Sequence, residues 1–211
     1  MMVNMIATPT IATNYEVKLY DLHQHTNLTE SAPTLVLMAG FAGAGKTTLA
    51  KRLSYWLQWE VLNKDVLKLE RLARGEEEEP AGWHAFEDLF RHIEKKVVEQ
   101  GKSVIIDTSN ERPFIFENVQ QVLEQLRCMH IYAQLQVILC VATKETRTKR
   151  LNKRGSVFAP YVQKLPMILD DAELPERFKH LPADKVQIVN TNPPLSTYDW
   201  KVLKALQLAK E

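Results

Sequence analysis

The chain has 211 residues, of which 45% are hydrophobic and 25% are charged, a length and composition that suit one globular α/β domain. The formal net charge of +1 excludes a global basic field that would attract the whole chain to nucleic acid or to an anionic membrane. Of the two cysteines, Cys128 and Cys140, neither has a CxxC partner, which disfavours a metal or redox centre, and Cys140 falls in an apolar run typical of a buried thiol.

The N-terminal residues do not follow the pattern of a secretory signal, and no apolar run reaches the ~18 residues that a membrane-spanning helix needs. We therefore expect a cytoplasmic protein. Residues 1–33 are predicted to form an N-terminal extension, and residues 34–211 are predicted to form the single domain.

The predicted elements of the first half begin with a continuous apolar run, which is typical of a strand buried on both faces of a parallel sheet. In chain order we expect a strand over 34–39, a helix over 46–59, a strand over 60–62, and an acidic loop over 76–79 that ends at Pro80. A helix follows, because Trp83, Phe86, Phe90, Ile93 and Val97 recur at intervals of three and four, with Gly101 at the position of a C-terminal cap.

The second half continues the alternation of strands and helices. We expect strands over 103–107, 135–141 and 186–189, a helix opened by Pro113 with Ile115, Val119, Val122 and Leu126 facing inward, a basic helix over 144–153, and helices over 161–169 and 198–209. This alternation predicts a three-layer α/β/α architecture around a five-stranded parallel sheet.

A glycine-rich segment follows the first strand and opens the first helix. Its sequence, GFAGAGKTT, matches GxxxxGK[ST] and contains three of the seven glycines in the chain. Glycine allows backbone N–H groups to turn toward phosphate oxygens, and the helix N-terminus adds a positive dipole end. A turn without a ligand is the plain alternative. We predict nucleotide binding by Gly40, Phe41, Ala42, Gly43, Ala44, Gly45, Lys46, Thr47 and Thr48, with Lys46 catalytic and Thr47 on Mg²⁺.

A carboxylate follows each of the next two strands, where the carboxyl ends of parallel strands line a ligand crevice. Asp65 is predicted to take the proton of an attacking hydroxyl, and Lys68, one helical turn later, is predicted to hold an anionic substrate. A helix cap and a surface lysine are the respective alternatives. Asp107 ends an apolar strand and is predicted to support Mg²⁺, while Thr108 and Asn110 are predicted to contact substrate or else to cap a turn.

The helix over 144–153 and the residues just after it are strongly basic. Arg150 and Arg154 are four residues apart and so share a helix face. Cations that close over a transferring phosphoryl group need this kind of placement, although a solvated basic face is the alternative. We predict that residues 144–171 form a lid that contributes both arginines to the site.

In these segments the chain resembles a small P-loop kinase of the group that contains adenylate, gluconate and polynucleotide kinases. The resemblance covers about residues 34–171 and is greatest to the 5′-hydroxyl polynucleotide kinase domain among AAA-type ATP-binding kinases. It rests on GFAGAGKTT, NKDVLK, GKSVIIDTSN and KRLNKRG. It implies the P-loop NTPase fold with strand order 2-3-1-4-5, Asp65 as general base, Lys68 on a substrate phosphate, and Arg154 in the lid. Position 68 is Lys where the family favours Arg.

We therefore expect an ATP- and Mg²⁺-dependent kinase that phosphorylates a hydroxyl of a small molecule, a nucleotide or a polynucleotide 5′ end. Nucleic acid is compatible with this prediction but not required, a membrane partner is not expected, and the protein is expected to be a monomer or a homodimer. Asp65 is predicted to be the base and Asp107 the metal support, with the reverse assignment left open.

Two alternative functions compete with the kinase. One is a P-loop module that binds or hydrolyses nucleotide without a dedicated acceptor. The other is a metal site at the DLHQH segment, in which His23 and His25 alternate, although no second cluster of ligands accompanies it in the sequence.

Overall fold

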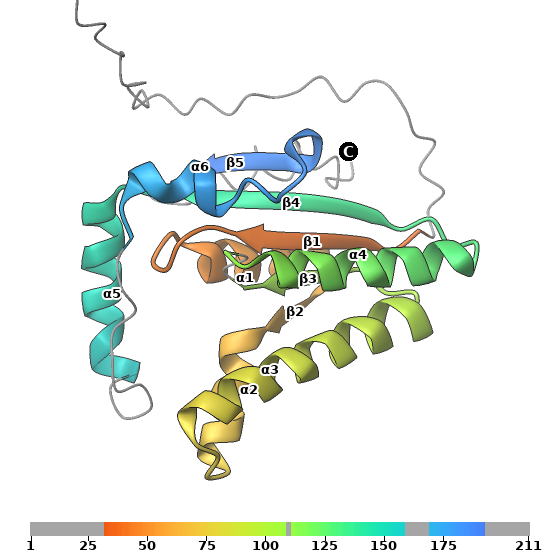
Figure 1. Cartoon of the computed structure of the whole chain (residues 1–211), viewed down its shortest axis with the longest axis horizontal. Helices are drawn as coiled ribbons and strands as arrows, with labels where there is room; N and C mark the ends of the chain where they lie inside the picture. Colours follow the sequence, from red (N-terminus) through yellow and green to blue (C-terminus); the bar gives the residue numbers. More distant parts are fainter. Residues whose placement is uncertain (1–31, 109–110, 159–168, 193–211) are drawn as a thin grey trace, which may run out of the picture.

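The computed structural model describes residues 32–108, 111–158 and 169–192 (Figure 1). Several sequence-based predictions fall outside these ranges. They are the histidine pair His23 and His25, the substrate contact at Asn110, nearly all of the expected helix over 161–169, and the whole of the expected helix over 198–209.

Five parallel strands form one sheet in the order β2-β3-β1-β4-β5. The central strand, β1, is buried along its whole length, as its uninterrupted apolar sequence predicts. In the register, Leu37 of β1 lies between Ile106 of β3 and Val137 of β4. The strands are β1 (Thr34–Ala39), β2 (Glu60–Asn63), β3 (Val104–Asp107), β4 (Gln134–Val141) and β5 (Val186–Asn190). The fold class and the strand order predicted from the sequence are thus confirmed.

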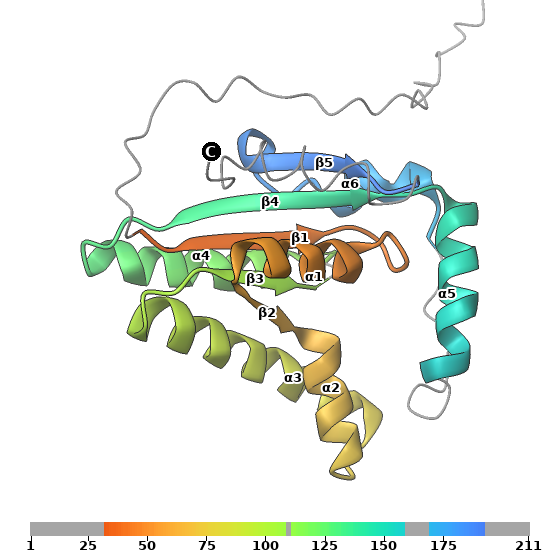
Figure 2. The same ribbon diagram turned by 180° about the vertical axis from the view of Figure 1, so that it is seen from behind.

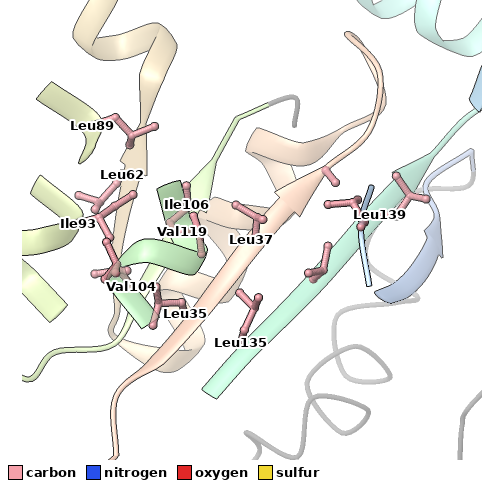
Figure 3. Close-up of a cluster of buried hydrophobic side chains, with 14 of the residues drawn as sticks. Leu35, Leu37, Leu62, Leu89, Ile93, Val104, Ile106, Val119, Leu135 and Leu139 are labelled. Carbon is pink, nitrogen blue, oxygen red and sulfur yellow. The ribbon is translucent and has the colours of Figure 1, made fainter. Parts of the chain in front are cut away.

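Helices α3 (Glu78–Ile93) and α4 (Pro113–Cys128) cover one face of this sheet (Figures 1 and 2). Their buried side chains join those of the strands in the larger hydrophobic core (Figure 3). The four residues of α4 predicted to face inward, Ile115, Val119, Val122 and Leu126, are all buried there. The spacing of apolar residues therefore predicted the packing of α4 correctly.

Helix α1 (Lys46–Leu57) covers the opposite face, where Leu49 and Leu53 pack with Met38 of β1 and Ile105 of β3 in a second core. Cys140 of β4 belongs to this core, and its burial raises the pKa of the thiol to about 12. Helix α1 ends two residues earlier than predicted because Gln58 takes a left-handed conformation with φ of 56°.

Helix α3 differs from its prediction in its start and in its buried face. It begins at Glu78, so the expected acidic loop is partly helical, and Pro80 lies in the first turn, where its missing N–H removes no helical hydrogen bond. The most deeply buried positions are Ala81, Ala85, Leu89 and Ile93. Trp83 is 53% exposed, so the large aromatic residue is not a core residue as its spacing suggested. A π-helical turn, Glu94–Glu99, continues the helix to Gly101.

The remaining elements lie at the carboxyl end of the sheet or lead back into it. Helix α2 (Lys64–Ala73) follows β2 directly, and α5 (Lys144–Phe158) follows β4 and extends beyond the predicted end at Lys153. Figures 1 and 2 show α5 standing across the carboxyl end of the strands. Short helical turns, Asp171–Glu173, α6 (Leu174–Arg177) and Ala183–Lys185, lead into β5. None of the helices described is long and apolar enough to cross a membrane.

Candidate functional site

The loop between β1 and α1 requires glycine at several positions. Gly40, Gly43 and Gly45 all have positive φ, of 130°, 80° and 90°. A Cβ atom on Gly40 would lie 2.3 Å from the Cys140 carbonyl oxygen, and one on Gly43 would lie 2.9 Å from the Arg147 carbonyl oxygen. The loop is therefore held tightly against β4 and α5, with the backbone turned into the left-handed region that a phosphate-cradling loop requires.

The ammonium group of Lys46 folds back over this loop. Its Nζ donates hydrogen bonds to the carbonyl oxygens of Gly40, at 2.7 Å, and Phe41, at 3.0 Å. Desolvation lowers the pKa of Lys46 below its ordinary value, although the nearby carboxylates of Asp107, Glu111 and Asp65 oppose that shift. A cation that donates to neutral carbonyl oxygens, with carboxylates at longer range, is well placed to bind phosphate oxygens.

Asp107, at the end of β3, is 3% exposed. Its carboxylate accepts a hydrogen bond from the Asn63 side-chain amide and is hydrogen-bonded to the Thr47 side chain. Desolvation raises the pKa of Asp107, and the Thr47 hydrogen bond and the charge of Lys46 offset only part of that rise. A hydroxyl next to a carboxylate supplies the oxygen ligands that Mg²⁺ prefers. The described residues contain no group of three His, Cys, Asp or Glu side chains suited to a metal ion, so Mg²⁺ would need further oxygens from nucleotide and water.

Asp65 lies in the first turn of α2, directly beyond β2. The helix cap is not Asp65 but Asn63, whose Oδ1 accepts from the backbone N–H groups of Asp65, at 2.8 Å, and Val66, at 3.0 Å. The Asp65 side chain remains 65% exposed and pairs with Lys64 at 2.7 Å. Desolvation opposes its ionisation, but the charges of Lys64, Lys46 and Arg154 outweigh this effect and lower the pKa of Asp65. The carboxylate is therefore ionised and accessible to a second ligand.

The other predicted acceptor residues lie in less open surroundings. The Lys68 ammonium pairs with Glu78 of α3 at 3.1 Å, so a carboxylate of the chain already holds this cation. Thr108, just after β3, is 5% exposed.

The arginines of α5 divide into three environments. Arg150 bridges the glycine loop and the end of β5, since its guanidinium donates to Gly43 O at 3.3 Å and to the Thr191 hydroxyl at 3.1 Å. Arg154, one turn later, is close enough to Asp65 to lower the pKa of that carboxylate. Arg147 is 1% exposed and contributes to the packing of the loop rather than to its open face.

Three residues that surround the loop were not assigned a role from the sequence. Asn63 both caps α2 and donates to Asp107. Glu111 lies near Lys46, and desolvation raises the pKa of its carboxyl group against the attraction of Lys46. The Thr191 hydroxyl donates to the Ala44 carbonyl oxygen at 2.7 Å. Asn63 stands in the quoted NKDVLK segment, whereas nothing in the local sequence around Thr191 signals its contact with a loop about 150 residues earlier.

A glycine loop with its lysine at the carboxyl end of the central strand, in a parallel sheet of order 2-3-1-4-5, defines the P-loop nucleotide-binding proteins of the kinase-type topology. A family model described as an AAA domain matches residues 35–160, which is more than half of the sequence. The chain belongs to this AAA domain family. No curated protein matches the sequence at a significant level.

Solved structures with the same fold are P-loop kinases. A protein of Chloroflexus aurantiacus described as a candidate kinase superposes with a TM-score of 0.60 at 21% identity, over 85% of this chain and 100% of its own. The APS kinase of Mycobacterium tuberculosis, in complex with AMPPNP and APS, gives a TM-score of 0.57 at 13% identity, over 83% and 98%. A gluconokinase of Sinorhizobium meliloti gives 0.50 at 12%, over 83% and 93%. At these sequence identities the structural similarity shows a shared fold alone.

Proposed function

We propose that this protein is a kinase that transfers the γ-phosphate of ATP, with Mg²⁺, to a hydroxyl group of a second substrate. The observation that carries the proposal is the convergence of Lys46, Asp65 and Arg154 from the glycine loop, α2 and α5. Asp65 is close enough to both cations for each of them to lower its pKa. Two cations around an accessible carboxylate suit a phosphoryl group that meets an attacking hydroxyl.

The glycine loop and the first turn of α1 would bind the nucleotide phosphates, through residues 40–48. Lys46 would exchange its carbonyl partners, Gly40 and Phe41, for phosphate oxygens. The Thr47 hydroxyl and the Asp107 carboxylate would hold Mg²⁺, which neutralises phosphate charge when bound. The fold shared with kinases such as the APS kinase in complex with AMPPNP supports this assignment.

Asp65 is the better candidate for the general base because its side chain is accessible. Asp107 is buried, and its carboxylate is hydrogen-bonded to Asn63 and Thr47. In the step proposed, the acceptor oxygen bonds to the γ-phosphorus, the bond from that phosphorus to the β–γ bridging oxygen breaks, and the hydroxyl proton passes to Asp65. Arg154 and Arg150 would neutralise charge on the transferring group from the lid, residues 144–171, of a domain that spans residues 34–211.

The test compares two variants at a series of Mg²⁺ concentrations. ADP release is measured with hydroxyl acceptors that include sugars, nucleosides and 5′-hydroxyl oligonucleotides. Asp65→Asn keeps the side-chain shape and removes the base, so transfer should fall by ~10²- to 10⁴-fold with ATP affinity nearly unchanged. Asp107→Asn should instead raise the Mg²⁺ concentration needed for half-maximal rate.

Two results would contradict parts of this assignment. A shifted Mg²⁺ requirement in Asp65→Asn but not in Asp107→Asn would reverse the two roles. ATP hydrolysis that no hydroxyl compound accelerates would identify a nucleotide-binding or ATPase module instead of a kinase.

A further inference from the structure

Two of the acidic residues expected in a solvated loop, Glu76 before α3 and Glu78 in its first turn, form ion pairs with cations of α2. Glu78 pairs with Lys68 at 3.1 Å. Arg71 is held on both sides, by Glu76 at 2.6 Å and by Asp88 at 2.7 Å. Lys68 and Arg71 of α2 are therefore already paired with carboxylates of the protein.

The net charge of this region is negative. Residues 64–88, which include all of α2 and most of α3, carry four basic and eight acidic side chains. Glu111, beyond β3, adds a further carboxylate near Lys46. A phosphate or carboxylate on the part of an acceptor that lies along α2 and α3 would therefore meet like charge, and it could pair with Lys68 or Arg71 only by displacing a carboxylate from an existing ion pair. An uncharged acceptor meets neither cost.

Close to Asp65, the first turns of α2 and α4 and the first half of α3 bring together an aromatic cluster. Lys64 pairs with Asp65 at 2.7 Å, and its Nζ lies 5.4 Å from the centroid of the Phe86 ring. The ring centroids of Phe86 and Phe114 are 5.0 Å apart. The centroid of the Trp83 ring lies 6.4 Å from that of Phe86 and 6.0 Å from that of Phe114. A chain of direct contacts thus leads from the candidate base to an indole that is about half exposed.

The exposure of Trp83 is itself informative. The buried positions in this part of α3 are the small residues Ala81 and Ala85, whereas the Trp83 indole is 53% exposed. The half-exposed indole packs on two phenyl rings and offers a flat apolar surface of the kind that stacks against sugar rings and planar heterocycles.

From these two observations we propose that the phosphate acceptor is an uncharged, ring-bearing hydroxyl compound, such as a sugar or a nucleoside, and that its ring packs against Trp83. The proposal rests on the proposed kinase function. It makes Trp83 an acceptor-binding residue, and it makes the ion pairs of Lys68 and Arg71 determinants of specificity against phosphorylated acceptors. The acceptor hydroxyl then lies toward Asp65, at the other end of the aromatic cluster.

The test uses matched ring-bearing acceptors that differ in one charged group: ribose with ribose 5-phosphate, glucose with glucuronate, and a nucleoside with its 3′-monophosphate. Transfer rates are measured with ATP, and binding is measured by calorimetry with a non-hydrolysable ATP analogue. The uncharged member of the preferred pair should bind and react better. Trp83→Ala should raise the KM of that acceptor by about three- to tenfold with the KM of ATP unchanged, and Trp83→Phe should restore part of the loss.

The control is Trp56→Ala, on the last turn of α1, because Trp56 is exposed to a similar extent, at 57%, and lies outside the aromatic cluster. It should leave both KM values unchanged. The double variant Glu76→Gln/Glu78→Gln removes the carboxylate partner of Lys68 and leaves Arg71 with Asp88 alone, so it should lower the KM of the charged member of each pair.

The outcomes separate the two proposals. Preference for the charged members, failure of every uncharged compound to bind, or an acceptor KM that does not change in a folded Trp83→Ala protein would each overturn this inference and leave the kinase proposal standing. Binding of an uncharged compound that depends on Trp83, without phosphate transfer, would support the site and contradict the kinase function.

Discussion

The guanidinium of Arg147 lies 4.9 Å from the centroid of the Phe41 ring, so a buried cation of α5 covers an aromatic residue of the glycine loop. The Phe41 ring also packs against the Phe178 ring, with 5.5 Å between the ring centroids. The same guanidinium donates to the Leu169 carbonyl oxygen at 2.7 Å and pairs with Asp171 at 2.6 Å. Arg147 therefore joins the phosphate-binding loop to both ends of the candidate lid.

We expect Arg147→Ala to destabilise the fold by roughly 3–5 kcal/mol, because it empties a buried site and leaves the Ala142 and Leu169 carbonyl oxygens without their donor. Urea denaturation followed by circular dichroism measures the change. Lys149→Ala, on the exposed face of the same helix, is the control and should change stability by less than about 0.5 kcal/mol. Equal, small effects of both substitutions would show that Arg147 does not hold the loop.

Lys46→Ala should lower ATP turnover by at least ~10²-fold with the fold intact, because it removes the cation that bridges the phosphates. Its hydrogen bonds in the protein are to two loop carbonyls, so its loss should change thermal stability little compared with its effect on turnover. Steady-state kinetics and a thermal melt are measured on the same preparation. Wild-type turnover in a folded variant would exclude the assigned role of the loop.

Arg154→Ala should lower kcat more than it weakens nucleotide binding, because we assign its charge to the transition state. Arg150→Ala should act in the same direction but less severely. It should also lower the melting temperature, since Arg150 holds Gly43 and Thr191 together. Rates and ATP affinity are measured for both variants. Wild-type kcat in both would identify the basic helix as a solvated face.

Asp107→Asn should stabilise the protein in the absence of nucleotide and Mg²⁺. Because the pKa of Asp107 is raised in the folded state above its ordinary value of 3.8, this group favours folding at low pH, and its contribution is lost as pH rises through the raised pKa. The amide variant has no charge to lose, and Asn63 can still donate to its oxygen.

The gain should be on the order of 1 kcal/mol at neutral pH, or about 2–4 °C in Tm for a protein of this size. Melts of both proteins between pH 4 and pH 8 test this. The difference should grow with pH and disappear toward the acid end. A constant difference, or a less stable variant at neutral pH, would contradict the assigned cause.

The alternation of strands and helices in the sequence determined the fold class, and the resemblance to P-loop kinases implied the strand order. The alternation depends on local signals, since an uninterrupted apolar run makes a buried strand, and the spacing of glycine, lysine and threonine predicts a phosphate-binding turn between strand and helix. The periodicity of α4 likewise predicted its buried face, because its four buried residues recur at intervals of three and four.

The same reasoning was wrong for the start of α3, where the buried positions are Ala81 and Ala85 and Trp83 is half exposed. Only the tertiary structure decided which charges meet. Lys68 is held by Glu78, Arg71 by Glu76 and Asp88, and Arg150 by Thr191, from elements between 5 and 41 residues away. The energy of an ion pair depends on distance and burial, which residue type and spacing do not specify. The sequence therefore predicted a phosphate-binding site, and the three-dimensional arrangement of its charges determined what lies beside it.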